Sequence, residues 1–174
     1  MSTGQAGHDQ ERKGRAMPVR FFHPKGPNGW LSNFSPHAVD LDGQVWPTAE
    51  HLYQALKFPH DAERRQRIRD AKSPGLAKRI AHEREAQPSV DWDSRKVDAM
   101  RQVLRLKFAQ HPDLAEKLLN TADRRLVEHR TRDAFWGDGG DDSGQNWLGQ
   151  LLMEMRKELQ TGASTGVYPS ATLT

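Results

Sequence analysis

The chain of 174 residues contains no cysteine. This absence excludes disulfide bonds, thiol nucleophiles and thiolate-ligated metal sites, and it fits the reducing cytoplasm where we expect the protein to act. The sequence also lacks an apolar run near the ~18 residues that a membrane span needs. Its first residues have no apolar core of the kind found in signal peptides, so we expect no membrane association.

Metal-binding patterns and a strong charge of one sign are missing as well. The 8 histidines are scattered and show no metal-ligand spacing, so the sequence predicts neither a metal nor a cofactor. A net charge of +3 and a pI near 9.3 are compatible with an anionic ligand but too small to indicate nucleic-acid binding. The arginines between Arg64 and Arg84 alternate with acidic residues and lack an aromatic platform, which is typical of solvated helix faces.

The length fits one domain, with few apolar residues at either end of the chain. We predict a disordered extension at residues 1–17, a domain at 18–160 and a disordered tail at 161–174. Apolar periodicity and capping residues predict an α+β, predominantly helical fold with a small antiparallel sheet. Helices are expected at 61–71, 73–85, 94–110, 113–121 and 148–159, and strands at 19–22, 39–46 (a hairpin) and 126–129.

The stretch from Gly29 to Phe58 carries the densest information. Asp42-Gly43 between alternating apolar residues predicts a hairpin with a type I′ turn. Pro47 and Thr48 then predict a helix start, since Thr can cap the first amides. The apolar stripe of this helix consists of Ala49, Leu52, Tyr53 and Leu56, whereas Glu50, Gln54 and Lys57 share a different face.

That polar face is a candidate site. A carboxylate such as Glu50 in the first turn of a helix is favoured in its ionised form, which suits a base or a group that stabilises a developing cation. Seven residues span about 10 Å of helix, so Glu50 and Lys57 could flank one sugar. Alternatively, both belong to the ordinary solvated face of a helix.

Two loops offer further candidate sites. The Gly- and Pro-rich residues 23–29 either wrap a ligand or form a plain connection. Gly137, Gly139 and Gly140 precede the last helix, and such turns allow backbone amides to approach a phosphate. Trp92, at an expected junction between a loop and a helix, belongs either to the core or to a surface that stacks on a base.

Two spaced blocks of residues resemble the signature of the NADAR, or YbiA-like, family, and the resemblance covers roughly residues 20–160. Between the blocks, Trp92 stands where the family carries a tryptophan. The first block contains Ser32-Asn33-Phe34-Ser35, Leu41-Asp42-Gly43, Trp46-Pro47-Thr48-Ala49-Glu50-His51 and Gln54-Ala55-Leu56-Lys57-Phe58. The second contains Ala134-Phe135-Trp136-Gly137-Asp138-Gly139-Gly140 and Asn146-Trp147-Leu148-Gly149.

This resemblance implies the YbiA-like fold and hydrolysis of an N-glycosidic bond between a phosphorylated ribose and a base. Family members are linked to phosphoribosylamino-pyrimidine intermediates of riboflavin synthesis, which would give ribose 5-phosphate and a free pyrimidine, or to removal of ADP-ribose from guanine. The family's catalytic positions map onto Glu50, Trp92 and Asp138. We add Lys57 as a catalytic candidate. Further expected substrate contacts within the motif blocks are Asn33, Phe34, His51, Gln54, Trp136, Gly137, Gly139, Gly140 and Asn146.

Cleavage of a ribosyl C–N bond builds positive charge on the sugar, so one carboxylate could stabilise the cation while another activates water. Glu50 and Asp138 form this hypothetical pair, which requires them to meet in one cavity. Trp92 or Trp136 could stack on the base. In a second route, Lys57 attacks the ring-opened imine and forms a Schiff base.

Three other functions remain open at this stage. The chain could remove ADP-ribose from guanine in nucleotides or nucleic acid, so that nucleic acid enters only as an ADP-ribosylated substrate. It could be a module that binds NAD or ADP-ribose without cleaving it, although a binder has no need of two carboxylates beside an anionic ligand. A nucleic-acid-binding protein is the weakest reading. The sequence indicates no oligomeric state.

Overall fold

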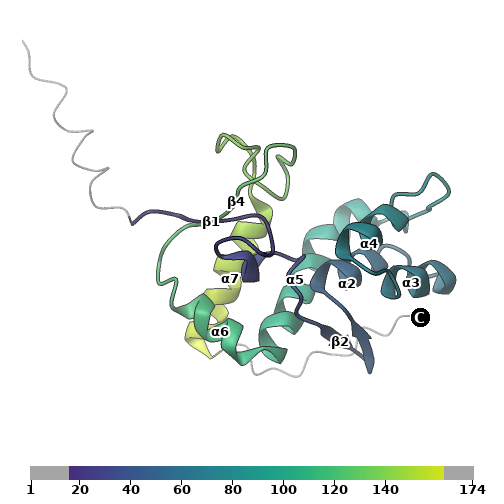
Figure 1. Ribbon diagram of the computed structural model, residues 1–174, viewed down its shortest axis with the longest axis horizontal. Coiled ribbons are helices and arrows are strands. Elements are labelled where there is room, and N and C mark those ends of the chain that lie inside the picture. Colours follow the sequence, from purple (N-terminus) through teal and green to yellow (C-terminus); the bar gives the residue numbers. More distant parts are fainter. Residues whose placement is uncertain (1–15, 163–174) are drawn as a thin grey trace, which may run out of the picture.

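The computed structural model describes residues 16–162, so the extension and tail predicted as disordered fall almost entirely outside the described residues. Within that range the fold is α+β and mostly helical, as predicted (Figure 1). The strands are β1 (Val19–Phe21), β2 (Val39–Leu41), β3 (Gln44–Trp46) and β4 (Leu126–Glu128). The helices are η1 (a 3₁₀ turn, Gly29–Leu31), α2 (Ala49–Ala55), α3 (Ala62–Arg69), α4 (Pro74–Ile80), α5 (Trp92–Gln110), α6 (Pro112–Leu119) and α7 (Trp147–Thr161).

The four strands form two separate pairs. β2 and β3 make the predicted antiparallel hairpin, and its turn has φ of 53° at Asp42 and 78° at Gly43, as a type I′ turn requires. β1 pairs with β4 in parallel, with Val19 opposite Leu126. The prediction of a small antiparallel sheet is therefore correct for the hairpin only, because β1 and β4 are joined by a long helical connection, which parallel pairing needs.

Two long helices form the centre of the molecule. α5 packs on α2, α6 and α7, and α7 also packs on β4 (Figure 1). The apolar stripe of α5 is buried, as expected from its periodicity, and includes Met100, Val103, Leu104 and Phe108. None of the helices in residues 16–162 combines the length and the apolar character needed to cross a bilayer.

Helices α2, α3 and α4 pack against one another beside this centre. The side chains of Thr48, Asp61 and Ser73 cap the three N-termini by accepting hydrogen bonds from backbone amides. α4 ends at Ile80, five residues before the predicted Glu85, because the chain turns at Ala81 and continues through irregular turns. This early end brings the C-terminal part of α4 close to α2.

Lys107 of α5 fixes the loop that follows η1. Its side chain is completely buried, and Nζ donates hydrogen bonds to the carbonyl oxygens of Trp30 and Ser32 and to Oγ of Ser35, at 2.7, 3.0 and 2.9 Å. Burial lowers the pKa of Lys107 to about 7. Three well-placed acceptors compensate the buried amine and hold this loop in one conformation.

Candidate active site

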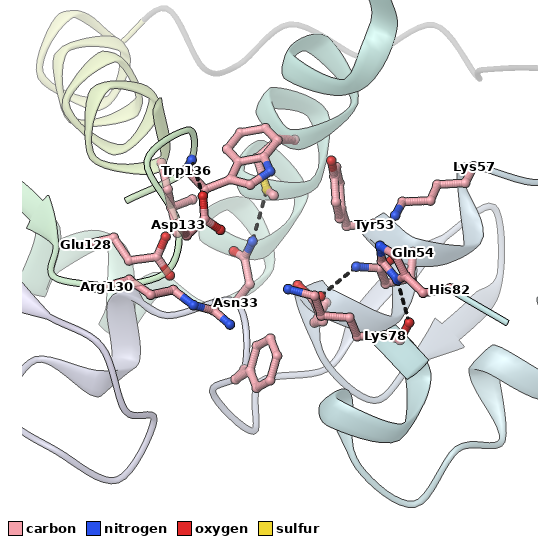
Figure 2. Close-up of a pocket in the computed structure, with 14 residues that line it drawn as sticks. Asn33, Tyr53, Gln54, Lys57, Lys78, His82, Glu128, Arg130, Asp133 and Trp136 are labelled. Carbon is pink, nitrogen blue, oxygen red and sulfur yellow. Dashed lines mark hydrogen bonds between the residues drawn. The ribbon is translucent and has the colours of Figure 1, made fainter. Parts of the chain in front are cut away.

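A cavity of about 190 Å³ lies where α2 and α4 face β4 and the loop after it. Figure 2 shows the side chains from α2 and α4 on one side, those from β4 and its loop on the other, and Asn33 between them. The lining residues are Asn33, Phe34, Glu50, Tyr53, Gln54, Lys57, Lys78, His82, Met100, Glu128, Arg130, Asp133, Trp136 and Leu148. The cavity thus collects three carboxylates and three cationic side chains in a small volume.

Glu50 enters the cavity from the first turn of α2. Its side chain is buried, as is every residue of this helix, so the alternative of a solvated polar face is wrong. Gln54 Nε2 donates a hydrogen bond of 2.7 Å to Glu50 Oε1. Burial raises the pKa of Glu50, and the Gln54 hydrogen bond and nearby cations offset only part of this effect. Desolvation therefore outweighs the helix-terminus effect expected from the sequence, and Glu50 can hold or release a proton closer to neutrality.

Lys57 lines the same cavity, but it lies in the turn after α2 rather than on the helix, which ends at Ala55. Its Nζ is 5.8 Å from the ring centroid of Tyr53 and 5.9 Å from that of Trp92. Burial lowers the pKa of Lys57 to about 8, although the negative charge of Glu50 opposes this shift. A substantial fraction of the amine is thus neutral, and so nucleophilic, near pH 8.

Glu128 is a cavity carboxylate that the sequence reasoning missed. It is the last residue of β4, 6% exposed, and its carboxylate has no hydrogen-bond partner within residues 16–162. The pKa of Glu128 is raised to about 7, chiefly by burial. Arg130 opposes this shift, and the negative charges of Asp133 and Glu50 add to it. The available signal was an acidic residue ending an otherwise apolar strand.

Three other cavity residues were also missed. Lys78 lies on α4, His82 lies just beyond it, and Arg130 follows β4 (Figure 2). His82 Nδ1 donates to the carbonyl oxygen of Lys78 at 2.7 Å, which fixes the ring orientation. Lys78 lies in a region that sequence reasoning interpreted as surface only. Lys57, Lys78 and Arg130 give the cavity a cationic rim suited to an anionic ligand, whereas burial lowers the pKa of His82.

The predicted contacts Asn33, Phe34 and Trp136 all line the cavity. Asn33 Nδ2 contacts the sulfur of Met100 at 3.0 Å, while its buried Oδ1 has no partner in the described structure. Trp136 packs edge-on against Tyr53, with ring centroids 5.7 Å apart. A buried amide oxygen without a partner inside a cavity is an acceptor available to a ligand hydroxyl.

Asp138 is not among the residues that line this cavity, and its expected role in catalysis stays a prediction. The side chain is fully buried and accepts hydrogen bonds from Arg20, His129 and the backbone amides of Arg130 and Gly140. Burial alone would raise its pKa, but these donors outweigh burial and lower the pKa of Asp138 to about 2. These four donors, one from β1 and three from the segment after β4, hold the loop around Asp138 in place.

The glycines around Asp138 also shape the loop rather than the cavity wall. Gly139 and Gly140 have φ of 73° and 92°, and their amides already donate to Asp133 and Asp138. A Cβ on Gly137 would lie 2.9 Å from the carbonyl oxygens of Asp133 and Glu128. The backbone amides of Gly139 and Gly140 are therefore already occupied and are not free to donate to a phosphate, as the sequence had suggested.

Two other predicted contacts, His51 and Asn146, and the predicted catalytic residue Trp92 are not among the residues that line the cavity. His51 is buried and bonds to Thr48 Oγ1 and the carbonyl oxygen of Ala71. Asn146 accepts from the amide of Glu128 at 3.0 Å and donates to the carbonyl oxygen of Leu126, so it clamps β4. Trp92 packs on Tyr53 with ring centroids 5.4 Å apart and supports Lys57 from outside the lining set.

Comparison with known proteins agrees with this architecture. The family model described as NADAR domain matches residues 20–160. N-glycosidase YbiA of Escherichia coli strain K12 is 44% identical over 141 residues, which cover 81% of this chain and 88% of that protein. N-glycosidase Npun_R5314 of Nostoc punctiforme is 39% identical over 155 residues, covering 87% and 99%.

Two further relatives extend the comparison. Riboflavin biosynthesis protein VVA0006 of Vibrio vulnificus is 42% identical over 147 residues, covering 84% of this chain but 40% of that longer protein. The NMR structure of the E. coli protein YbiA superimposes with a TM-score of 0.78 at 40% identity and covers 88% of this chain and 91% of that chain. The chain belongs to the NADAR domain family.

Proposed function

We propose that this protein is an N-glycosidase that hydrolyses the C–N bond between a phosphorylated ribose and an amino-pyrimidine. The observation that carries the proposal is the presence of two buried carboxyl groups, Glu50 and Glu128, in one small cavity with a cationic rim. Burial raises the pKa of both carboxyl groups, that of Glu128 to about 7, which suits them to proton transfer. Relatives named N-glycosidase and riboflavin biosynthesis protein support the same reaction class.

The cationic rim provides the contacts for the phosphate. Lys78 and Arg130 line the cavity, and neither side chain forms an ion pair within residues 16–162. An unpaired guanidinium and an unpaired ammonium are the groups that bind phosphate oxygens most effectively. We place the phosphate between them and the ribose hydroxyls near the free Oδ1 of Asn33.

Lys57 supports a route through a covalent imine. When the ribose ring opens, the C1–O4 bond breaks, O4 takes a proton from Glu128 and the substrate nitrogen, which keeps its own proton, forms a protonated imine with C1. The neutral amine of Lys57 attacks C1, and its proton passes through Glu50 to the substrate nitrogen. The C1–N bond then breaks, the base leaves as a free amine, and C1 remains as an imine on Lys57.

Water completes the reaction. Glu50 removes a proton from the water that attacks C1 and passes it to the Lys57 nitrogen as the resulting carbinolamine collapses, while the carbinolamine hydroxyl gives its proton to Glu128. The products are aldehydic ribose 5-phosphate and neutral Lys57, and both carboxyl groups return to their starting states. The net change consumes one water and releases one base and one sugar phosphate. Direct attack of water on the closed sugar gives the same products without a covalent intermediate.

The cavity volume favours a small substrate over ADP-ribosylated guanine. At about 190 Å³ the cavity is below the ~300–1,000 Å³ of sites for drug-sized ligands, so it accommodates a ribose phosphate more readily than a complete ADP-ribose. Removal of ADP-ribose from guanine is the second candidate because it breaks a bond of the same type.

The decisive experiment is incubation of the full chain with a phosphoribosylamino-pyrimidine and, separately, with an ADP-ribosylated guanine nucleotide. Mass spectrometry should detect free pyrimidine and ribose 5-phosphate from the first. Glu50→Gln should reduce turnover by at least ~100-fold, the size of a lost general acid–base contribution. Glu116→Gln, on the exposed face of α6, is the matched control. Absence of cleavage, or full activity of Glu50→Gln, would refute the proposal.

A further inference from the structure

A second cavity of about 250 Å³ adjoins the first. The two share Phe34, Glu128 and Arg130, which form a common wall. The remaining lining of the second cavity comes from the end of β1, the loop after it and the loop after η1, namely Phe22, His23, Pro24 and Ser32. Whereas the first cavity is rich in charged groups, the second presents one phenyl ring, an imidazole, a proline and a serine beyond the shared wall.

Phe22 is the unusual residue of this lining. Its side chain is 51% exposed although it directly follows the buried end of β1. The guanidinium of Arg130 lies 5.8 Å from the centroid of the Phe22 ring. An exposed ring beside an arginine, at the border of a catalytic cavity, is an arrangement that stacks on a flat, nitrogen-rich base.

The loop that carries this wall is held in place. Gly26 and Gly29 donate backbone hydrogen bonds to His23 and Gly26, and Asn28 Nδ2 donates to the carbonyl oxygen of Arg20 at 3.1 Å. At Gly29 a Cβ would lie 2.3 Å from the carbonyl oxygen of Pro24, so only glycine allows the loop to fold back so closely. The aromatic wall is therefore formed before any ligand arrives.

His23 adds a polar contact of defined direction. Its Nδ1 accepts a hydrogen bond from the backbone amide of Lys25 at 3.2 Å, which leaves the proton on Nε2 in the neutral ring. Nε2 has no partner within residues 16–162. The imidazole can thus donate to a carbonyl oxygen on the edge of a base.

Resting on the N-glycosidase function proposed above, we infer that this second cavity is the base subsite. The planar base of the substrate stacks on the face of Phe22, and the sugar phosphate, held by Lys78 and Arg130, occupies the first cavity. The scissile C–N bond then crosses the shared wall. This places the Glu128 carboxyl beside C1 and O4 of the ribose, where its proton is needed for ring opening.

Substitution of Phe22 tests the inference kinetically. Phe22→Ala should raise KM for the phosphoribosylamino-pyrimidine by about tenfold, as expected for loss of one base–aromatic stack. Phe22→Trp should keep KM near that of the unmodified protein. Inhibition by free ribose 5-phosphate should be unchanged in both variants. Val45→Ala, an equally exposed apolar residue (58%) on the distant hairpin, is the control. An unchanged KM in Phe22→Ala, or equal loss of ribose 5-phosphate binding, would overturn the inference.

A second measurement, which needs no turnover, is the separate binding of the free base and of ribose 5-phosphate. In ¹H–¹⁵N NMR spectra, 5,6-diaminouracil should shift the resonances of residues 22, 23 and 34, and ribose 5-phosphate should shift those of residues 50, 57 and 78. Shifts by the base on the ribose phosphate side, or none at residues 22–34, would refute the subsite. Base binding at Phe22 without any substrate cleavage would instead refute the N-glycosidase proposal and leave the subsite standing.

Discussion

Gln54 Nε2 donates a hydrogen bond of 2.7 Å to Oε1 of Glu50, one turn earlier on the same helix. Both side chains are buried, and Gln54 Oε1 has no partner among the described residues. Among the described residues, the Gln54 side chain therefore hydrogen-bonds only to the Glu50 carboxylate. It fixes the orientation of Glu50 and stabilises the ionised form in a site where burial opposes ionisation.

Gln54→Met should raise the pKa of Glu50 further, because it removes the hydrogen bond that lowers it. If Glu50 acts as a base, the acidic limb of the kcat/KM profile should move to higher pH. Carboxyl ¹³C NMR titration measures the pKa directly. Gln66→Met is the matched control, since Gln66 donates an amide hydrogen bond of the same length to Asp70 on an exposed face. If the acidic limb of the kcat/KM profile does not move in Gln54→Met, Glu50 takes no part in the proton-transfer steps.

Lys57 should form a reducible adduct during turnover. Borohydride added to the reacting protein should fix a ribose phosphate on Lys57, detected as a mass increase on the peptide that contains it. Trapping should strengthen between pH 6 and 8, because burial lowers the pKa of Lys57 to about 8 and the neutral amine is the nucleophile. Lys57→Arg should give no adduct, and Lys72→Arg, at an exposed position, should behave as the unmodified protein. Turnover without any adduct would favour direct hydrolysis.

Glu128→Gln should abolish the ionisation near pH 7 in the kcat/KM profile and, at the same time, stabilise the fold above that pH. The folded pKa of Glu128 is raised to about 7, so its favourable effect on stability is complete below the unfolded pKa and is lost as pH rises through 7. A shift of this size corresponds to about 3 kcal/mol in the free energy of unfolding.

Chemical denaturation at pH 5 and pH 8 measures this effect. The unmodified protein should lose stability between the two pH values relative to Glu128→Gln, whereas Glu116→Gln should follow the unmodified protein. If both variants and the unmodified protein share one pH dependence, Glu128 does not titrate near neutrality. Its role as a proton donor would then fail as well.

Local patterns predicted the elements of this fold well because each depends on neighbouring residues. The turn at Asp42-Gly43, the Thr48 cap and the apolar stripe of α5 all follow from short-range chemistry. The parallel pairing of β1 with β4 depends on contacts more than 100 positions apart, as between Val19 and Leu126, and no local pattern encodes it.

Because local patterns do not encode contacts between distant positions, only some of the site residues were found from the sequence. Glu50 and Lys57 were identified because they share a short segment with motif residues. Glu128 and Arg130 were missed because the β1–β4 pairing and the packing of α7 bring them to the cavity. Asp138 was predicted as catalytic from the family resemblance; in the structure, backbone amides and neighbouring side chains surround its carboxylate.

We therefore expect the main effect of Asp138→Asn to be on the stability of the fold. The folded pKa of Asp138 is depressed to about 2, so its contribution is present above the unfolded pKa and is lost as pH falls through about 2. We expect Asp138→Asn to lower the free energy of unfolding by about 2 kcal/mol at pH 7, with the difference shrinking between pH 4 and 2. Asp141→Asn, exposed in the same loop, should cost much less.

The pH profile separates this positioning role from a catalytic one. Asp138→Asn should lower kcat/KM, because the loop that carries Arg130 loosens, while both limbs of the profile keep their positions. Asp138 holds that loop through the amides of Arg130 and Gly140 and lies outside the cavity lining, so we expect it to act through the loop. Loss of a limb at unchanged stability would instead show that Asp138 takes part in the reaction.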